Sequence, residues 1–276
     1  MNLALPQHSS EKIAPFLKWA GGKRWLASTL ASDFKLVSGH YIEPFLGGGA
    51  IFFELQPPRS VLNDVNQDLI NAYSAIKEDW QRVESLLHAH SRKHNKRYYY
   101  DIRAYVPRCK FQQAARFIYL NRTCWNGLYR VNLNGQFNVP KGTKDSVILN
   151  SDNWEATARL LQSSRLVCGD FQETIDQAKE GDLIFADPPY TVKHDLNGFI
   201  KYNESLFTWQ DQERLCKALG NAVERGVRVI STNANHKSIR ALYEGRFRIR
   251  SLVRPSVLSA DPAFRGPCQE LLIESH

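Results

Sequence analysis

Leu183-Ile184-Phe185-Ala186-Asp187-Pro188-Pro189-Tyr190 is the stretch that decides the fold. Its first four residues are apolar, as in a buried strand, and the two prolines then end strand pairing and hold an extended turn. A carboxylate, a turn rich in carbonyls and an aromatic ring therefore leave the strand together. Such a group can receive a flat amine: Asp187 and a proline carbonyl accept its two protons, and Tyr190 stacks on its ring. An ordinary turn at a strand end is the alternative, so the rest of the chain must decide.

Other strand and helix patterns alternate on both sides of this stretch. A helix is predicted after Thr208, which can cap it together with Asp211 three residues later. The alternation predicts an α/β core formed by both ends of the chain. The strands are predicted at Tyr41–Glu43, Ser60–Asp64, Arg165–Cys168, Asp182–Ala186 and Val227–Ser231, with a terminal hairpin of Phe247–Val253 and Leu271–Ile273.

Positive charge is concentrated in one segment of the chain. The chain has 36 Lys and Arg residues and 28 Asp and Glu residues, a formal charge of +8. Between Arg92 and Lys144 the only acidic residue is Asp101, and aromatic residues alternate with the basic ones. Cations that bind phosphate, beside rings that stack on bases, are typical of a nucleic-acid surface. A solvated basic face over a local aromatic core is the alternative. Because the segment lies between the second and third predicted core strands, we expect an inserted, mostly helical domain.

Neither secretion, nor a membrane span, nor a metal site is expected. The chain starts with polar residues, and its first apolar stretch, near Phe16, is short and interrupted by Lys18. The 5 cysteines are scattered without metal spacing, so we expect reduced thiols in a cytoplasm. His88, His90 and His94 lie in a basic segment without nearby carboxylates, so we expect no zinc there.

A glycine turn follows the first predicted strand, in Glu43-Pro44-Phe45-Leu46-Gly47-Gly48-Gly49-Ala50. Such a turn lets backbone approach a ligand closely and points a helix N-terminus at it. It lacks the Lys-Ser/Thr of a Walker loop and the G-x-G-x-x-G order of dinucleotide enzymes. Asp64, at the end of the next strand, is placed for ribose hydroxyls, and Glu43 would repel phosphate but attract an ammonium. S-adenosylmethionine satisfies these conditions better than NAD does.

A second stretch with an aromatic residue and glycines, Phe16-Leu17-Lys18-Trp19-Ala20-Gly21-Gly22-Lys23, lies upstream of this turn. It is either a loop before a helix from Arg24 to Leu30 or a second wall of the cofactor site. In the second case we expect Trp19 to pack on the cofactor and Lys23 to meet a carboxylate.

Together these motifs resemble those of Dam-type DNA adenine-N6 methyltransferases, the D12 class in which the cofactor motif precedes a DPPY motif. The resemblance implies a Rossmann-like methyltransferase core, with a mixed, mostly parallel seven-stranded sheet, and an inserted, mainly helical target-recognition domain. It implies a discontinuous catalytic domain, 1–66 and 158–276, around a recognition domain, 67–157. The stretches that carry it, in family order, are Phe16–Lys23, Glu43–Ala50, Asn63–Asn66, Tyr119–Arg122, Asn126–Leu128, Phe137–Pro140, Asp170–Phe171 and Asp187–Tyr190.

The resemblance also implies a reaction and the residues that carry it. An adenine would be flipped out of duplex DNA, Asp187 and the Pro188 carbonyl would hold its amino group, and Tyr190 would stack on the base. Methyl transfer would be direct and in line, without a metal, and would yield S-adenosyl-L-homocysteine. The catalytic residues implied are Asp187, Pro188, Pro189 and Tyr190. The residues implied for S-adenosyl-L-methionine are Trp19, Ala20, Gly21, Lys23, Glu43, Pro44, Phe45, Gly47, Gly49, Asp64, Asp170, Phe171 and Asp187.

For double-stranded DNA, the resemblance implies contacts made mainly by the basic segment. Arg130 would contact a guanine edge in the major groove, and Trp125 and Asn126 would fill the gap around the displaced base. These positions match family members that methylate GATC. Trp125 in place of tyrosine, Lys141 in place of an apolar residue, and the segment Ser259–Gly266 depart from the family pattern. The DNA-binding residues implied are Lys18, Arg122, Trp125, Asn126, Leu128, Arg130, Asn138 and Pro140.

Other interpretations stay open. Pro267-Cys268 has the form of the nucleophile of cytosine-C5 methyltransferases, but that cysteine should stand where Asp187 stands, so we expect Cys268 to be a buried structural thiol. A cytosine-N4 enzyme usually has serine in place of the aspartate, and an RNA adenine methylase would also need a basic segment. A catalytically silent DNA-binding module is a further alternative, although the intact cofactor and amine-binding motifs argue against it. We expect a monomer, associated with the nucleoid of a bacterial or phage-infected cell, with or without a restriction endonuclease partner.

Overall fold

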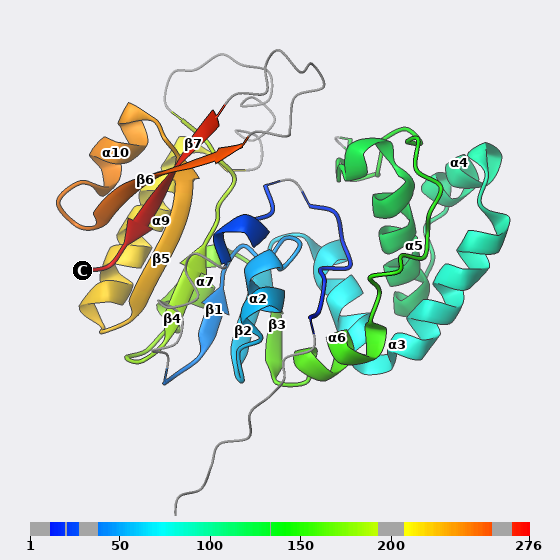
Figure 1. The fold of residues 1–276 in the computed structure, drawn as a ribbon, viewed down its shortest axis with the longest axis horizontal. Coiled ribbons are helices and arrows are strands. Elements are labelled where there is room, and N and C mark those ends of the chain that lie inside the picture. Colours follow the sequence, from blue (N-terminus) through cyan, green and yellow to red (C-terminus); the bar gives the residue numbers. More distant parts are fainter. Residues whose placement is uncertain (1–11, 20, 28–37, 133, 193–206, 256–266) are drawn as a thin grey trace, which may run out of the picture. The chain divides into compact units, whose positions relative to one another are not determined.

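The computed structural model describes residues 12–19, 21–27, 38–132, 134–192, 207–255 and 267–276 (Figure 1). The chain forms two compact units. The helical unit comprises Met1–Lys35, Gly47–Pro58 and Asn66–Leu166, and the sheet unit comprises Leu36–Leu46, Arg59–Val65 and Val167–His276. Ala20 and the segment Ser259–Gly266 lie outside the described residues. The functional domain boundaries after residues 66 and 157 stay a prediction.

The seven strands form a single mixed sheet. Its order is β3-β2-β1-β4-β5-β7-β6. β1 pairs parallel with β2 and β4, β4 pairs parallel with β5, and β7 runs antiparallel between β5 and β6. The predicted mostly parallel, seven-stranded sheet and its terminal hairpin are therefore confirmed. The strands are β1 (Tyr41–Glu43), β2 (Ser60–Asp64), β3 (Ser164–Cys168), β4 (Leu183–Ala186), β5 (Arg228–Ala234), β6 (Arg248–Pro255) and β7 (Pro267–Glu274).

The β4 strand occupies the centre of this sheet. Its four residues are at most 1% exposed, because β1 and β5 flank it and helices of the sheet unit cover it. Ile184 pairs with Ile42 of β1 and Val229 of β5, so three apolar side chains lie in register across the sheet. A run of four apolar residues suits this position, where both faces of the strand are buried.

Three helices pack in the sheet unit: α7 (Phe171–Asp176), α9 (Trp209–Glu224) and α10 (Lys237–Tyr243). Leu215 and Leu219 of α9 are fully buried in the same core as Ile184. The α9 helix begins with the predicted cap: Thr208 Oγ1 accepts from the Asp211 amide, and the Asp211 carboxylate accepts from the Thr208 amide. Both orphan amides of the first turn are thereby satisfied.

The helical unit contains α2 (Ala50–Leu55), α3 (Gln67–Lys93), α4 (Lys96–Ala104), α5 (Lys110–Thr123), the short 3-10 helix η1 (Trp125–Gly127) and α6 (Trp154–Leu161). Asn66 caps α3 by accepting from the Leu69 amide, and non-helical backbone at Asp79 kinks it. The α3 helix packs along α5 and α6. Phe16 joins this core, with ring centroids 4.8 Å from Tyr73 and 5.8 Å from Trp154. Among the described residues no helix could cross a membrane.

Candidate active site

The carboxyl ends of three neighbouring strands meet at one edge of the sheet. β1 ends at Glu43, β2 at Asp64 and β4 at Ala186, just before Asp187. Because β1 pairs parallel with both β2 and β4, these three ends lie on the same edge. Open α/β sheets bind ligands outside the carboxyl ends of their strands. This edge of the sheet unit is therefore the candidate active site.

Hydrogen bonds from β5 and α9 hold the turn that follows β4. Thr232 of β5 donates from Oγ1 to Asp187 Oδ1 at 2.6 Å. Gln212 of α9 donates from Nε2 to the Pro189 carbonyl at 3.4 Å, and Asn233 Nδ2 donates to Gln212 Oε1 at 3.0 Å. Asp187 itself is partly exposed. The carboxylate is thus fixed in orientation without being buried completely.

Tyr190 is held by its hydroxyl group. The hydroxyl donates to Oε2 of Glu270, a residue of β7 that is 2% exposed, at 3.2 Å. Burial raises the pKa of Tyr190 well above its ordinary value, and the neighbouring charges of Asp187 and Glu270 raise it further. The tyrosine therefore stays protonated at neutral pH, and its ring orientation is set by the bond to Glu270.

Asn63 ties together the loops that follow β1, β2 and β3. Its side-chain amide donates to the Pro44 carbonyl at 2.9 Å and to the Gly169 carbonyl at 3.1 Å. Its backbone carbonyl accepts from the Leu46 amide at 2.8 Å. Its buried Oδ1 has no hydrogen-bond partner among the described residues. Asn63, which the sequence prediction gave no role in the site, thus positions the start of the glycine turn.

Two acidic side chains of the predicted cofactor site stand at the ends of β1 and β2. Glu43 is 3% exposed and accepts from Tyr41 Oη at 3.0 Å. Asp64 is partly buried, and its charge adds to burial in raising the pKa of the Cys168 thiol. Carboxylates at strand ends can accept hydrogen bonds from ribose hydroxyls or from an ammonium group.

Asp170 and Phe171 form the N-terminus of α7. Asp170 Oδ1 caps the helix by accepting from the Gln172 amide at 2.9 Å, and it also accepts from Arg214 Nη2 at 2.8 Å. The Phe171 ring stacks on Phe45, with centroids 5.3 Å apart. An aromatic cluster and carboxylates on one sheet edge fit the rings, hydroxyls and amines of a nucleoside cofactor such as S-adenosylmethionine.

Trp19 packs within the helical unit. Its ring stacks on Tyr129, with centroids 5.8 Å apart and planes 23° apart. Gly47 has a φ of 49°, and a methyl group there would lie 2.7 Å from Trp19 Cδ1. Both the backbone conformation and the close approach of the indole therefore require glycine at this position.

The other predicted cofactor residues of the helical unit have local roles. Gly49, with a φ of 63°, precedes the first residue of α2. Lys23 is 3% exposed, and its Nζ donates to the Gly21 carbonyl at 2.8 Å. The expected carboxylate partner of Lys23 stays a prediction.

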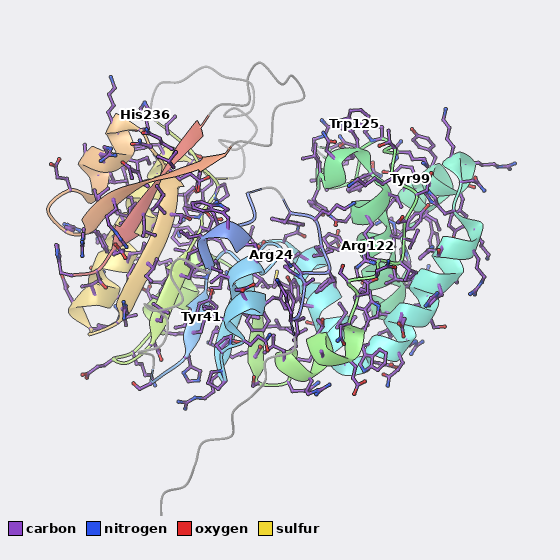
Figure 2. All side chains as sticks on the ribbon, viewed as in Figure 1. Arg24, Tyr41, Tyr99, Arg122, Trp125 and His236 are labelled. Carbon is purple, nitrogen blue, oxygen red and sulfur yellow. The ribbon has the colours of Figure 1, made fainter. Side chains whose placement is uncertain are left out.

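The predicted base-reading residues lie on η1 and the hairpin that follows it. Antiparallel bridges join Val131 to Phe137 and Cys124 to Lys141. Arg130 Nε donates to Asn138 Oδ1 at 2.8 Å, so these two predicted contacts support each other. Figure 2 shows Trp125 near the end of α5, where its side chain is 51% exposed. Other members of this group are Asn126, with a φ of 55°, Leu128, 38% exposed, and Pro140, whose carbonyl accepts from the Trp125 amide at 2.9 Å.

Lys18 is joined to the same group by Asn121. The Asn121 side chain accepts from the Lys18 amide and donates to the Lys18 carbonyl, both at 2.8 Å, and it also donates to the Gly127 carbonyl at 3.2 Å. Partial burial lowers the pKa of Lys18, and the positive charges of Lys144 and Arg122 lower it further. Lys18 and η1 are therefore held in fixed relation.

Arg122 corrects one expectation from the sequence. Its side chain is fully buried in the helical unit (Figure 2), where it donates to both carboxylate oxygens of Asp152 at 2.7 and 2.6 Å. It also donates to the carbonyls of Phe16 and Val147. A guanidinium occupied in this way has no donor left for a phosphate or a base, so Arg122 is a structural residue and not a DNA contact.

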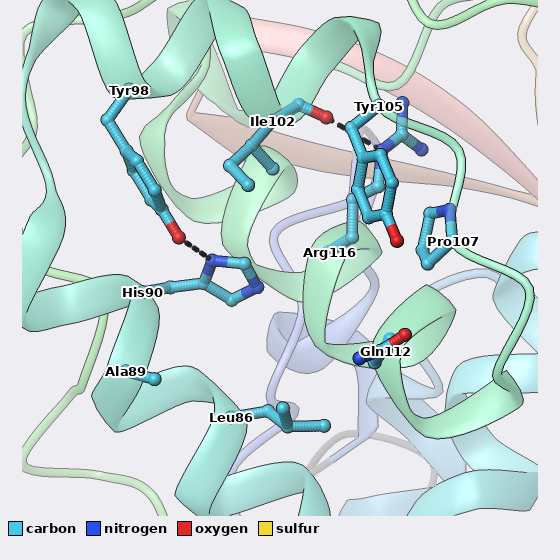
Figure 3. A pocket seen from close by; sticks show the side chains of 9 residues that line it. All are labelled: Leu86, Ala89, His90, Tyr98, Ile102, Tyr105, Pro107, Gln112 and Arg116. Atoms are coloured by element: carbon cyan, nitrogen blue, oxygen red, sulfur yellow. Dashed lines mark hydrogen bonds between the residues drawn. The ribbon is translucent and has the colours of Figure 1, made fainter.

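A small cavity of about 150 Å³ lies among α3, α4 and α5 (Figure 3). The Tyr98 hydroxyl and Nδ1 of His90 are hydrogen-bonded at 2.8 Å beside this cavity. Burial, and then the charge of Lys93, lowers the pKa of His90 to about 4, so the imidazole is neutral at pH 7. None of the predicted site residues lines this cavity. Within the described part of the chain, no group of three His, Cys, Asp or Glu side chains could hold a metal ion.

Thr232 and Glu270 were missed by the sequence prediction, and Asn63 was named only as part of the stretch Asn63–Asn66. Asn63 lies inside a predicted strand, Thr232 and Glu270 each lie one residue outside one, and all three are at most 2% exposed. Buried polar groups need hydrogen-bond partners, so polar residues in otherwise apolar strands are the signal that could have found them.

Comparisons with known proteins give a consistent result. The family model described as D12 class N6 adenine-specific DNA methyltransferase matches residues 19–255. The type II methyltransferase M1.LlaDCHI of Lactococcus lactis subsp. cremoris is 33% identical over 285 residues, covering 100% of this chain and 99% of the relative. M.MjaIII of Methanocaldococcus jannaschii is 33% identical, covering 90% and 93%. A DNA adenine methylase of Haemophilus influenzae is 32% identical, covering 95% and 93%.

The similarity to solved structures is weaker. Thermoplasma acidophilum 1320 aligns over 91% of this chain and 86% of its own, with 7% identity and a TM-score of 0.40. At this score the likeness supports no conclusion.

Proposed function

The chain belongs to the D12 class of N6 adenine-specific DNA methyltransferases, and on that basis we propose that it methylates an adenine flipped out of duplex DNA. The family implies S-adenosylmethionine as methyl donor. The observation that carries the proposal is the amine receptor at the end of β4, where Thr232 fixes the carboxylate of Asp187 and Glu270 fixes the hydroxyl of Tyr190.

Asp187 and Pro188 orient the nitrogen that is methylated. The Asp187 carboxylate and the Pro188 carbonyl accept the two N–H bonds of the adenine amino group, while Tyr190 stacks on the ring. S-adenosylmethionine supplies an electrophilic methyl group on a sulfonium. With both N–H bonds held, the N6 lone pair would point at that methyl. N6 would form the new C–N bond as the C–S bond breaks, S-adenosylhomocysteine would leave, and the Asp187 carboxylate, which already accepts an N6 hydrogen, would take the proton. Positioning and electrostatics suffice for this step, so it requires no covalent nucleophile and no metal.

The sheet-unit residues of the cofactor site have separate tasks in this proposal. Asp64 accepts hydrogen bonds from the ribose hydroxyls, Glu43 attracts the ammonium of the methionine part, and Asp170 and Phe171 meet the adenine part. Two observations support these roles. The parallel strands β1 and β2 bring Glu43 and Asp64 to one edge of the sheet, and the ring of Phe171 stacks on Phe45. The roles of Pro44, Trp19, Ala20, Gly21, Lys23, Gly47 and Gly49 stay predictions from the sequence.

The base readers are proposed to be the exposed group on η1 and its hairpin. Arg130, supported by Asn138, donates to a guanine edge, and Trp125 and Asn126 fill the space that the flipped base leaves. The proposed target is GATC. One copy of the chain suffices for one flipped base, and the type II names of relatives agree with a restriction endonuclease partner.

Base flipping is tested with a duplex that carries 2-aminopurine in place of the GATC adenine. We expect the fluorescence of this probe to change when the protein binds, because the base leaves the stack. The same probe placed outside the site is the control and is expected to stay unchanged. Equal responses of both probes would contradict flipping at GATC. Sequencing of modified bases in DNA from cells that express the chain reports the site directly, and methylation outside GATC would overturn the proposed target.

A further inference from the structure

Two buried polar residues on neighbouring strands contact the side chains of the amine receptor. Thr232 of β5 is fully buried and Glu270 of β7 is 2% exposed. β5 and β7 are antiparallel, with Thr232 opposite Leu272 and Ala234 opposite Glu270. Thr232 and Glu270 are therefore diagonal neighbours on one face of the sheet. Their side chains are hydrogen-bonded to Asp187 and Tyr190, in the turn that follows β4.

Thr232 fixes the orientation of the Asp187 carboxylate. Its hydroxyl lies 2.6 Å from Asp187 Oδ1, which is the short distance typical of a hydroxyl that donates to an ionised carboxylate. Thr232 thus contacts the proposed acceptor of the amine directly.

Glu270 fixes Tyr190 from the other side. Its Oε2 accepts from the tyrosine hydroxyl at 3.2 Å. A buried carboxylate is costly unless it is hydrogen-bonded, so the presence of Glu270 at a buried position of β7 requires a reason. Leu271, Leu272 and Ile273, which follow it, are all at most 1% exposed. The hydrogen bond that Glu270 accepts from Tyr190 explains why a carboxylate is buried at this position.

We propose that Thr232 and Glu270 are positioning residues of the methyl transfer, which hold Asp187 and Tyr190 in the arrangement that receives adenine. This inference rests on the proposed function. The transfer depends on aiming the nitrogen lone pair, and a displacement of about 1 Å at a reacting group can cost about 100-fold in rate. Loss of the hydrogen bond from Thr232 to Asp187, or of the one from Tyr190 to Glu270, therefore lowers the rate of the chemical step and leaves the binding of S-adenosylmethionine intact.

Ser231 offers a matched control for Thr232. It is the preceding residue of β5 and is also fully buried, but its hydroxyl donates to the Ala186 carbonyl at 2.9 Å and not to a motif side chain. Removing either hydroxyl takes away one hydrogen bond that β5 donates to the last residue of β4 or to the residue after it. Only the Thr232 hydroxyl contacts the receptor.

The experiment compares Thr232→Val, Thr232→Ser and Ser231→Ala with the unchanged protein. Single-turnover methyl transfer to duplex DNA, S-adenosylmethionine affinity by calorimetry and the unfolding midpoint are measured for each. We expect Thr232→Val to slow transfer by about 10- to 100-fold at unchanged cofactor affinity. Thr232→Ser keeps the hydroxyl and should restore the rate, whereas Ser231→Ala should lower the unfolding midpoint without slowing transfer.

Glu270 is tested through Tyr190 in a double-mutant cycle, which also serves if Thr232→Val fails to fold. Glu270→Gln keeps an acceptor for the hydroxyl and should retain most of the rate. Glu270→Leu and Tyr190→Phe each break the bond and should slow transfer, and the double variant should be no slower than the slower single variant. Additive losses would show that Glu270 does not act through Tyr190.

The inference would be overturned if Thr232→Val transferred methyl at the rate of the unchanged protein. It would also be overturned if Ser231→Ala slowed transfer as much as Thr232→Val does. Asp187→Ala in the same assay separates this failure from a failure of the proposed function. If Asp187→Ala is inactive while Thr232→Val is fully active, only the role of Thr232 is wrong. If Asp187→Ala is itself active, the proposed receptor is wrong.

Discussion

At the scale of single residues, Arg122 links several segments of the helical unit. It is fully buried, forms a bidentate pair with Asp152 and donates to two backbone carbonyls. Its guanidinium also lies 5.2 Å from the ring centroid of Trp154. Arg122 stands next to Asn121 in a helix with basic and aromatic residues, and its burial could not be predicted from the sequence. The reason is that its partner, Asp152, lies thirty residues further along the chain.

We predict that Arg122→Met destabilises the protein by about 3–5 kcal/mol, because it leaves the Asp152 carboxylate buried without its partner. Lysine should not rescue it, since one ammonium cannot replace the bidentate fork. Arg159→Met is the control: Arg159 and its partner Glu155 are each 69% exposed and 3.7 Å apart, so the change should stay within about 0.5 kcal/mol. Unfolding in urea followed by circular dichroism measures both. Equal effects of the two substitutions would contradict the structural role of Arg122.

The amine receptor shows what single residues can and cannot reveal in a sequence. Asp187, Pro188 and Tyr190 are recognisable because their chemistry is concentrated in four consecutive positions. Thr232 and Glu270 are not, because strand pairing brings them to the receptor from 45 and 80 residues away. Contacts of this kind depend on strand order, which a residue pattern does not contain.

At the scale of elements, the capping residues Thr208 and Asp211 mark the start of the α9 helix in the sequence. The structure has the reciprocal bonds between Thr208 and Asp211. The first four strands were predicted to within one residue of their ends because apolar runs mark them, whereas β7 begins four residues before the predicted Leu271. β5 continues three residues beyond the predicted Ser231, to Ala234, because Thr232, Asn233 and Ala234 pair with β7. The kink of α3 at Asp79 has no local signal in the sequence that we identified.

The cap of α9 makes a prediction about pH. Burial alone would raise the pKa of Asp211, but hydrogen bonds from Thr208 and Arg214 outweigh it and hold the pKa below its ordinary value of 3.8. A carboxyl group whose pKa is lowered by folding stabilises the folded state above its unfolded pKa, and this contribution is lost as the pH falls through the folded pKa. We therefore expect Asp211→Asn to cost about 0.5–1 kcal/mol at pH 7, and the difference to shrink below pH 3.8.

Unfolding free energies of the two proteins between pH 7 and pH 3 measure this effect. Glu224→Gln, at the exposed C-terminal end of the same helix, removes one charge without touching the cap and serves as the control. A loss that is the same at every pH would show that the charge of Asp211 does not contribute.

At the scale of the whole molecule, the chain divides its chemistry between two units. The sheet unit carries the amine receptor and the acidic strand ends, and the helical unit carries most of the basic segment. Exposed cations of that segment include Arg92, Lys93, Lys96, Arg97, Arg108, Lys110, Arg130 and Lys144. Composition predicted a polyanionic partner and the strand pattern predicted the core. The contacts of Asn63 with neighbouring loops and the burial of Arg122 could not be predicted from the sequence and are seen only in the structure.

The most direct test of the proposed receptor is the single-turnover rate of methyl transfer to duplex DNA by Asp187→Ala, with the transferred group identified by mass analysis of the nucleosides. The unchanged protein should yield N6-methyladenine. Asp187→Ala should keep most of its affinity for S-adenosylmethionine but transfer methyl at least about 100-fold more slowly, because the amino group has lost its carboxylate acceptor. Asp176→Ala, which removes an exposed carboxylate of the sheet unit, should leave the rate unchanged. Methylation by Asp187→Ala at the unchanged rate, or a methylated cytosine as product, would contradict the proposal that this carboxylate receives the adenine amine.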